Sequence, residues 1–414
     1  LLPPAEWTCA SGVLHSQPLS VQEAAWPLYE QSVERTIAGW QKRVMERSLR
    51  DPQFHKNLMF YGETGYSTGT NNLETALDEG LMLQFLRSGR RDWFAFAEAC
   101  IGHYADVDIN HSDSEAAGHI YVHGKFERTS TPHRANGHSW FNGTLIYGFF
   151  TASRRILEIA DQVGRYHSQV LPAWPEKTLI HYWRQPAWQM MGCLQGWDAT
   201  GNWDYVRGAK AIAEVTRVQR DHIVSLWPYM FTVGIRALRE YYETTGDPEA
   251  RELYLQLFDG YIRLRQRPHD TSFGEHAKEE QMVLGNYPND RSCCFYDEAA
   301  QADRLAGQQR YAKLLGPDLT LQLEYGINDP TFLWGSADLL RGMRDSGLSF
   351  SSRPSPDVDV AFTPVSMPDS PLAVFACPVL AFQFTEEADR DFTVRMYNRP
   401  YRKYSGKYRG QAMV

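Results

Sequence analysis

Hydrophobic positions along the first 350 residues follow a helical period and are interrupted by short turns. Apolar side chains recur three and four residues apart, and each run ends at a small residue before a second run begins. Glycine ends a helix well and aspartate or serine caps the next one, so each turn predicts a pair of antiparallel helices. These turns lie, at intervals of 63, 49, 45 and 61 residues, near Gly89, Ala152, Gly201, Gly246 and Gly307.

Paired helices that recur about every 50 residues predict a mainly α-helical fold, either an open solenoid or a closed α/α toroid. Two long connections, residues 109–137 and 267–291, favour the toroid, because loops of this length in a compact domain usually carry function. Aromatic residues make up 13% of the chain, and we expect most to be buried and a minority to line a cavity. We therefore predict an α/α-toroid domain of about six helical hairpins over residues 1–350.

The pattern changes near residue 350. A Ser/Pro-rich linker, SFSSRPSPDVD, is followed by the short apolar or alternating runs DVAFTPV, LAVFACPVLAFQF and DFTVRMYN. These runs predict a β-rich C-terminal region over residues 351–414. A region this short supports little core of its own, so we expect it to pack against the helices.

Composition and charge exclude several classes of partner. The 414 residues carry a net charge of −8, which should repel polyanions, so we expect no nucleic-acid partner. No apolar stretch approaches the roughly 20 residues of a membrane span, so we expect no membrane partner. The first residues, LLPPAEWTCASG, lack a signal-peptide pattern and indicate a mature or trimmed chain. The six cysteines lack zinc-ribbon spacing and are typical of buried thiols.

Positive charge gathers in HIYVHGKFERTSTPHRANGHSWFNG, residues 119–143. Lys125, Arg128 and Arg134 stand there against one acid, Glu127, in a chain that is acidic as a whole. This local excess of cations predicts a negatively charged ligand.

A helix should begin near Ser139, with Ser139 or Asn136 as its N-cap. Either choice places His138 at the helix N-terminus, which favours an anion. The spacing predicts that the core-facing residues are Phe141, Leu145 and Phe149, and that the neighbouring stripe is Trp140, Gly143, Thr144 and Tyr147.

Four stretches carry a resemblance to a known family. NNLETALDEGLMLQFLRSGRRDWF, YADVDINHSD, VHGKFERTSTPHR and GHSWFNGTLIYGFFTASRR resemble the α/α-toroid core of the exo-acting rhamnogalacturonan lyase-like proteins and related polysaccharide lyases. The similarity is best over residues 55–165. It departs from the family in two ways: TASRR stands where the family has a TGD turn, and the sequence does not include the large N-terminal β domain typical of such lyases.

The resemblance implies β-elimination from a uronic acid in an acidic oligo- or polysaccharide, without metal or cofactor. The enzyme must neutralise the carboxylate, stabilise the enolate-like intermediate and place a base beside C5. The resemblance assigns catalysis to His123, His133 and His138, and substrate binding to Arg134, Asn71 and Asn72. We predict His138 as the base or the carboxylate-neutralising group, with Arg134 on the carboxylate.

A tyrosine should protonate the leaving oxygen, and the candidates are Tyr61, Tyr66 and Tyr147. Further substrate contacts are expected from Trp140, Tyr287 and Arg291. These assignments together predict an exo-acting polysaccharide lyase. Because it degrades a polymer, we expect it to be secreted or periplasmic.

Other functions stay open at this point. A metal site would use His103, Asp106, Asp108, His111 and Asp113. Cys293 and Cys294 are typical of cysteine-ligated zinc glycosidases, but the matching upstream Glu-x-Cys is missing. A glycoside hydrolase needs two acids across a sugar bond, which would come from Asp198, Asp204, Glu279, Glu280, Asp297 or Glu298. The last alternative is a glycan-binding protein without catalysis.

Overall fold

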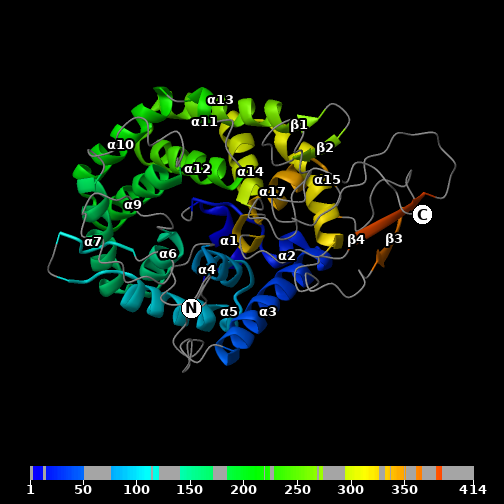
Figure 1. The fold of residues 1–414 in the computed structure, drawn as a ribbon, viewed down its shortest axis with the longest axis horizontal. Coiled ribbons are helices and arrows are strands. Elements are labelled where there is room, and N and C mark those ends of the chain that lie inside the picture. Colours follow the sequence, from blue (N-terminus) through cyan, green and yellow to red (C-terminus); the bar gives the residue numbers. More distant parts are fainter. Residues whose placement is uncertain are drawn as a thin grey trace.

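The computed structural model shows a mainly α-helical protein, which confirms this part of the predicted fold (Figure 1). The helices form an inner and an outer layer, and the short helix α1 lies near the centre of the arrangement. The residues that the structure describes are 3–12, 15–50, 76–112, 115–120, 140–170, 184–218, 220–223, 228–267, 270–273, 294–325, 332–335, 337–348, 350, 360–365 and 379–384.

Helices of the inner layer contact one another in cyclic order. Each touches the next, and α16, near the end of the series, touches the first helix, α4. The inner helices are α4 (Leu77–Ser88), α6 (Asn142–Thr151), α9 (Arg184–Thr200), α12 (Pro228–Thr245), α14 (Cys294–Ala306), α16 (Phe332–Gly335) and α17 (Ala337–Asp345).

Outer helices cover the inner layer, and most of them follow an inner helix directly in the chain. They are α3 (Pro27–Arg50), α5 (Arg91–His103), α7 (Arg154–Val170), α10 (Trp203–Val218), α13 (Pro248–Arg265) and α15 (Arg310–Tyr325). The shorter elements are α1 (Ala5–Ala10), α2 (Val21–Ala24), α11 (Arg220–Ile223), a π-helical turn (Tyr104–Asp108) and the paired strands β1 (Gln266–Arg267) and β2 (Asp270–Phe273).

The two layers differ in their hydrophobic patterns. On outer helix α7, buried Ile156, Ile159, Ala160 and Val163 form one stripe, while the opposite face is polar. On inner helix α9, residues 186–196 are buried on every face. A helix that is buried all round belongs inside a protein, so the burial of each of these helices agrees with its layer.

Each helix pair turns through a residue in the left-handed region. The five turns predicted from the sequence are all found, with φ of 70° at Gly89, 55° at Ala152, 70° at Gly201, 69° at Gly246 and 65° at Gly307. Glycine accepts this conformation without a Cβ clash and thereby ends the inner helix sharply. A sixth turn of the same kind follows α17 at Gly347, with φ of 75°.

Ala152 is the alanine in this series, so Ala152→Gly should stabilise the protein. A left-handed alanine is strained, and removing its Cβ relieves this strain. Glycine also makes the unfolded chain more flexible, which offsets part of the gain, so the free energy of unfolding should rise by about 0.5–1 kcal/mol. Gly246→Ala is the matched control, since its new Cβ would meet no atom within 4 Å and would suffer only the backbone strain. Urea unfolding should shift the two variants in opposite directions; a shift in the same direction would contradict this account.

Two strands lie within the predicted C-terminal region. β3 (Val360–Val365) and β4 (Val379–Phe384) pair antiparallel, with Val360 opposite Phe384 and Val365 opposite Val379. The rest of residues 351–414 lies outside the described residues, so the packing of this region on the helices stays a prediction. None of the described helices combines the length and apolarity that a membrane crossing requires.

Candidate functional site

Most of the predicted site residues lie outside the part of the chain that the structure describes. The predicted catalytic and substrate-binding residues outside the described part are Tyr61, Asn71, Asn72, His123, His133, Arg134, His138, Tyr287 and Arg291. The two that the structure describes, Trp140 and Tyr147, lie just before and within α6.

Trp140 is a buried core residue. Its side chain is 1% exposed, and its ring packs edge to face against Trp188 with centroids 5.7 Å apart. The guanidinium of Arg236 lies 5.5 Å from the ring centroid, and the Tyr104 hydroxyl donates to the Trp140 carbonyl oxygen at 2.6 Å. The ring therefore offers no open face to a sugar, which does not fit the substrate contact expected from the sequence.

Tyr147 faces the outer layer of helices. Its ring stacks on Phe94 of α5, and its hydroxyl donates to Glu98 Oε1 at 2.8 Å. Burial and the Glu98 carboxylate raise the pKa of Tyr147 to about 12, so the hydroxyl keeps its proton, as a general acid must. To act on a substrate, however, it would have to leave Glu98.

The helix that contains Tyr147 starts later than predicted. α6 begins at Asn142, with no side-chain cap, whereas the sequence predicted a start near Ser139. Gly143 packs so closely on α4 that an added Cβ would lie 2.1 Å from the Glu79 backbone nitrogen. Trp140, Gly143 and Thr144 of the neighbouring stripe are buried, and Tyr147 is partly buried. Of the residues predicted to face the core, Phe141 and Leu145 are buried, whereas Phe149 is 50% exposed.

Buried charged and amide groups meet where the inner helices face one another. Arg236 of α12 donates through Nη2 to Glu79 Oε1 of α4 at 2.5 Å and through Nε to Glu240 Oε1 at 2.9 Å. Asn142 of α6 also donates to Glu240 Oε1, at 2.9 Å, and accepts a hydrogen bond from the Gln195 amide of α9. This network of hydrogen bonds thereby connects four inner helices, α4, α6, α9 and α12.

The two acids that share Arg236 differ in proton affinity. Burial raises the pKa of Glu79, and the nearby Arg236 does not fully offset it. For Glu240, burial acts in the same direction, but Arg236, His15 and Arg239 outweigh it and lower the pKa. The surroundings of the two acids therefore shift their pKa values in opposite directions.

A second buried arginine holds the N-terminal segment, residues 3–12 and 15–20. Arg239 of α12 is fully buried; it binds Glu298 of α14 at 3.0–3.3 Å and donates to the His15 carbonyl oxygen at 3.0 Å. The His15 ring lies between Glu243 Oε2, at 3.0 Å, and Asp198 Oδ2, at 3.5 Å. Burial lowers the pKa of His15, but these two carboxylates outweigh it and raise the pKa to about 10, so the ring is a cation at neutral pH.

Asp78, beside Glu79 on α4, should make stability depend on pH. Burial raises its pKa to about 7, against a 2.9 Å hydrogen bond from Thr144 Oγ1. Because the folded protein keeps this proton while the unfolded chain releases it near pH 4, stability is lost as pH rises from about 4 to 7.

Asp78→Asn removes this ionisation. The free energy of unfolding of the variant, relative to that of the parent protein, should therefore increase by roughly 2–3 kcal/mol between pH 5 and pH 8. Urea unfolding at both pH values measures the gain. Asp204→Asn is the control, because Asp204 is exposed on α10 and pairs with Arg207. A gain that is equal at the two pH values would refute the buried, protonated state of Asp78.

A cavity of about 410 Å³ lies at the end of the inner helices where the tight turns are found; we name it the turn-end cavity. Phe149 and Phe150 line it from the end of α6, and Asp198 lines it from the last turn of α9. The remaining wall from the inner helices is formed by Leu86, Asn142, Leu145, Ile146, Gln195 and Glu240. The wall from the N-terminal segment is formed by Pro3, Trp7, Thr8, Ser11 and His15.

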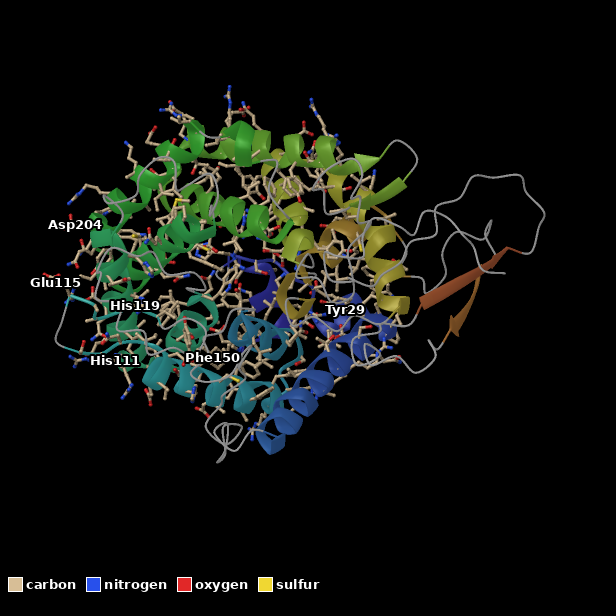
Figure 2. The ribbon with its side chains drawn as sticks, in the orientation of Figure 1. Tyr29, His111, Glu115, His119, Phe150 and Asp204 are labelled. Atoms are coloured by element: carbon tan, nitrogen blue, oxygen red, sulfur yellow. The ribbon has the colours of Figure 1, made fainter. Side chains whose placement is uncertain are left out.

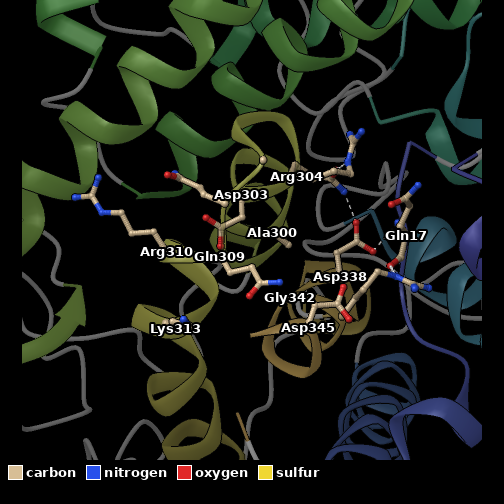
Figure 3. Close-up of a pocket in the computed structure, with 14 residues that line it drawn as sticks. Gln17, Ala300, Asp303, Arg304, Gln309, Arg310, Lys313, Asp338, Gly342 and Asp345 are labelled. Atoms are coloured by element: carbon tan, nitrogen blue, oxygen red, sulfur yellow. Dashed lines mark hydrogen bonds between the residues drawn. The ribbon is translucent and has the colours of Figure 1, made fainter. Parts of the chain in front are cut away.

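A second, more open cleft of about 650 Å³ lies between the turn after α14 and helix α17 (Figure 3). Gln17 of the N-terminal segment lines it, as do Arg304, Arg310 and Lys313. Its acids are already engaged: Asp338 accepts hydrogen bonds from Ser16, Gln17 and Gln301, and Asp303 accepts from the first N–H groups of α15. The N-terminal segment thus contributes side chains to both cavities.

The alternative metal sites receive no support from the described residues. No three of their His, Cys, Asp and Glu side chains gather in a way that could hold a metal ion. In the predicted metal motif, His111 bonds to Gln162 and to the Ala105 carbonyl oxygen, and Asp106 pairs with Arg155. Asp113 and Cys293 lie outside the described residues.

The predicted hydrolase acids are scattered. Asp297 and Glu298 are buried beside Arg239, and Asp204 is exposed on outer helix α10. Asp198 does reach the turn-end cavity, whereas Glu279 and Glu280 lie outside the described residues. The acid that lines the same cavity, Glu240, was not predicted.

Comparison with protein-family models, curated proteins and solved structures found no match.

Proposed function

We propose that the protein is a polysaccharide lyase built on an α/α toroid, with a small β-rich region at residues 351–414. The cyclic contacts of the inner helices and the outer layer that covers them support the toroid. The substrate is a uronate-containing glycan, cleaved from a chain end by β-elimination without metal or cofactor. A secreted or periplasmic location fits a substrate of this size.

The observation that carries the proposal is the place of α6. The segment with His123, His133, Arg134 and His138 leads directly into this inner helix. The first residue of α6, Asn142, is hydrogen-bonded to Glu240 of α12 among the buried polar groups. The basic stretch of residues 119–143 therefore leads into the first turn of α6, beside these buried polar groups. In a toroid, this interior region is where a substrate can be enclosed.

In the proposed reaction, His138 removes the C5 proton while Arg134 neutralises the neighbouring carboxylate. The electron pair left at C5 forms the C4–C5 double bond as the C4–O bond breaks. A tyrosine then donates its proton to the departing oxygen. The candidates for this acid are Tyr61, Tyr66 and Tyr147, of which Tyr147 would first have to leave Glu98, to which its hydroxyl is bound.

Carboxyl reduction of the substrate tests the proposal. A C5 proton is acidic enough for elimination only beside a carboxylate, so a lyase should cleave the native glycan and leave the carboxyl-reduced glycan intact. A panel of pectic, ulvan-like and glucuronan oligosaccharides, each in both forms, covers the main uronate classes. Equal cleavage of both forms would point to a hydrolase, and cleavage of neither would point to a binding protein.

A further inference from the structure

The turn-end cavity extends along α6, from Asn142 in its first turn to Phe150 in its last. Its aromatic wall from this ten-residue helix, Phe149 and Phe150, lies in the last turn. We propose that the turn-end cavity binds an uncharged sugar residue of a glycan.

Exposed aromatic rings mark this cavity. Trp7 is 63% exposed, Phe149 50% and Phe150 37%, and all three line it. Among the described phenylalanine and tryptophan side chains, one more is exposed to a similar extent: Trp203, which lies on α10, outside this cavity. Apolar rings gathered at a surface cavity indicate a ligand, and the C–H face of a pyranose ring packs well on them.

Polar groups in the same wall provide the hydrogen bonds that sugar hydroxyls need. Gln195 is 3% exposed, and its amide nitrogen donates a hydrogen bond to Asn142. Its Oε1 is buried and has no hydrogen-bond partner among the described residues. Because a buried acceptor is rarely left unpaired, this oxygen suits a ligand hydroxyl. Asp198 and Glu240 add carboxylate acceptors beside it. The cavity volume of about 410 Å³ is within the usual range for small-ligand sites.

The charged side chains in the wall of the turn-end cavity determine which sugars it can bind. The described wall residues include two carboxylates, Asp198 and Glu240, and one cation, His15. His15 is already paired with Asp198 and with Glu243. Two of the described buried guanidinium groups contact wall residues, and both are paired: Arg236 with Glu79 and Glu240, and Arg239 with Glu243 and Glu298. The carboxylates of Asp198 and Glu240 in the wall should repel a uronate, so we expect the site to prefer neutral sugars over acidic ones.

A printed array of neutral and uronic oligosaccharides is the first test, followed by calorimetric titration of the neutral oligosaccharide with the strongest signal. Trp7→Ala, Phe149→Ala and Asp198→Asn should each weaken its binding at least tenfold. The matched controls are Trp203→Ala and Asp204→Asn, which change an exposed tryptophan and an exposed aspartate on α10 and should stay within twofold of the parent. Figure 2 shows Asp204 at the outer edge of the molecule, away from Phe150.

The proposal is overturned if no neutral oligosaccharide binds at 10 mM, or if Trp7→Ala and Asp198→Asn both bind as the parent does. Tighter binding of the uronic series at this site would overturn the uncharged class. The result is independent of cleavage: loss of neutral-sugar binding in Trp7→Ala with full lyase turnover on a short uronate substrate would show that sugar binding in the turn-end cavity is not required for cleavage.

Discussion

Replacing Arg239 with methionine is expected to lower the free energy of unfolding by about 3–5 kcal/mol. The side chain is fully buried, and it donates to Glu298, Glu243 and the His15 carbonyl oxygen. Methionine fills similar space without charge or donors, so it leaves Glu298, which is itself fully buried, as an uncompensated anion. Chemical denaturation followed by circular dichroism measures the loss.

Arg304→Met is the matched control for this prediction. Arg304 also pairs with Glu243, but it is 38% exposed, so its loss should cost no more than about 1 kcal/mol. Should Arg239→Met be too unstable to purify, the double variant Arg239→Met/Glu298→Gln removes both charges and should recover part of the stability. Equal losses in Arg239→Met and Arg304→Met would show that the buried ion pairs do not hold the inner helices together.

Replacing His138 with alanine is expected to lower turnover at least about 100-fold, because the proposed mechanism loses its base. The unperturbed pKa of histidine, about 6.5, suits proton transfer near neutral pH. The melting temperature should stay within about 3 °C of the parent, since a base that acts on the substrate is not required for packing. Turnover on the active uronate substrate and a thermal scan together give both values.

His111→Ala is the control histidine. His111 is exposed, and its ring bonds to Gln162 and to the Ala105 carbonyl oxygen, so its loss should leave turnover within about twofold. If His138→Ala keeps parental turnover, or loses it only by unfolding, the base must be sought at His123, His133 or a tyrosine.

The helix pairs could be predicted because their signal is local. A left-handed turn requires glycine or tolerates a small residue, and the apolar runs on either side report their own helical period. Ala152 was found in this way although it is not glycine, since the runs around it are strong. The start of α6 was missed because close packing of Gly143 on α4, rather than a capping side chain, fixes the beginning of this helix.

The buried ion network was not predicted, because its partners come from helices far apart in the chain. A local signal was nevertheless present in IRALREYYE: Arg236, Arg239, Glu240 and Glu243 recur at helical spacing within a run that is otherwise apolar. Charges on one stripe of a helix whose other faces are buried must meet partners in the interior. The wall of the turn-end cavity was also missed, since its exposed Trp7 belongs to a segment without helical repeats.

The masses of the products made from one defined uronate oligosaccharide test the central claim most directly. Elimination adds no water, so a lyase predicts two fragments whose masses add up to that of the substrate, one of them with an unsaturated, ultraviolet-absorbing end. Fragments whose masses exceed the substrate by one water, without that absorbance, would contradict the lyase assignment.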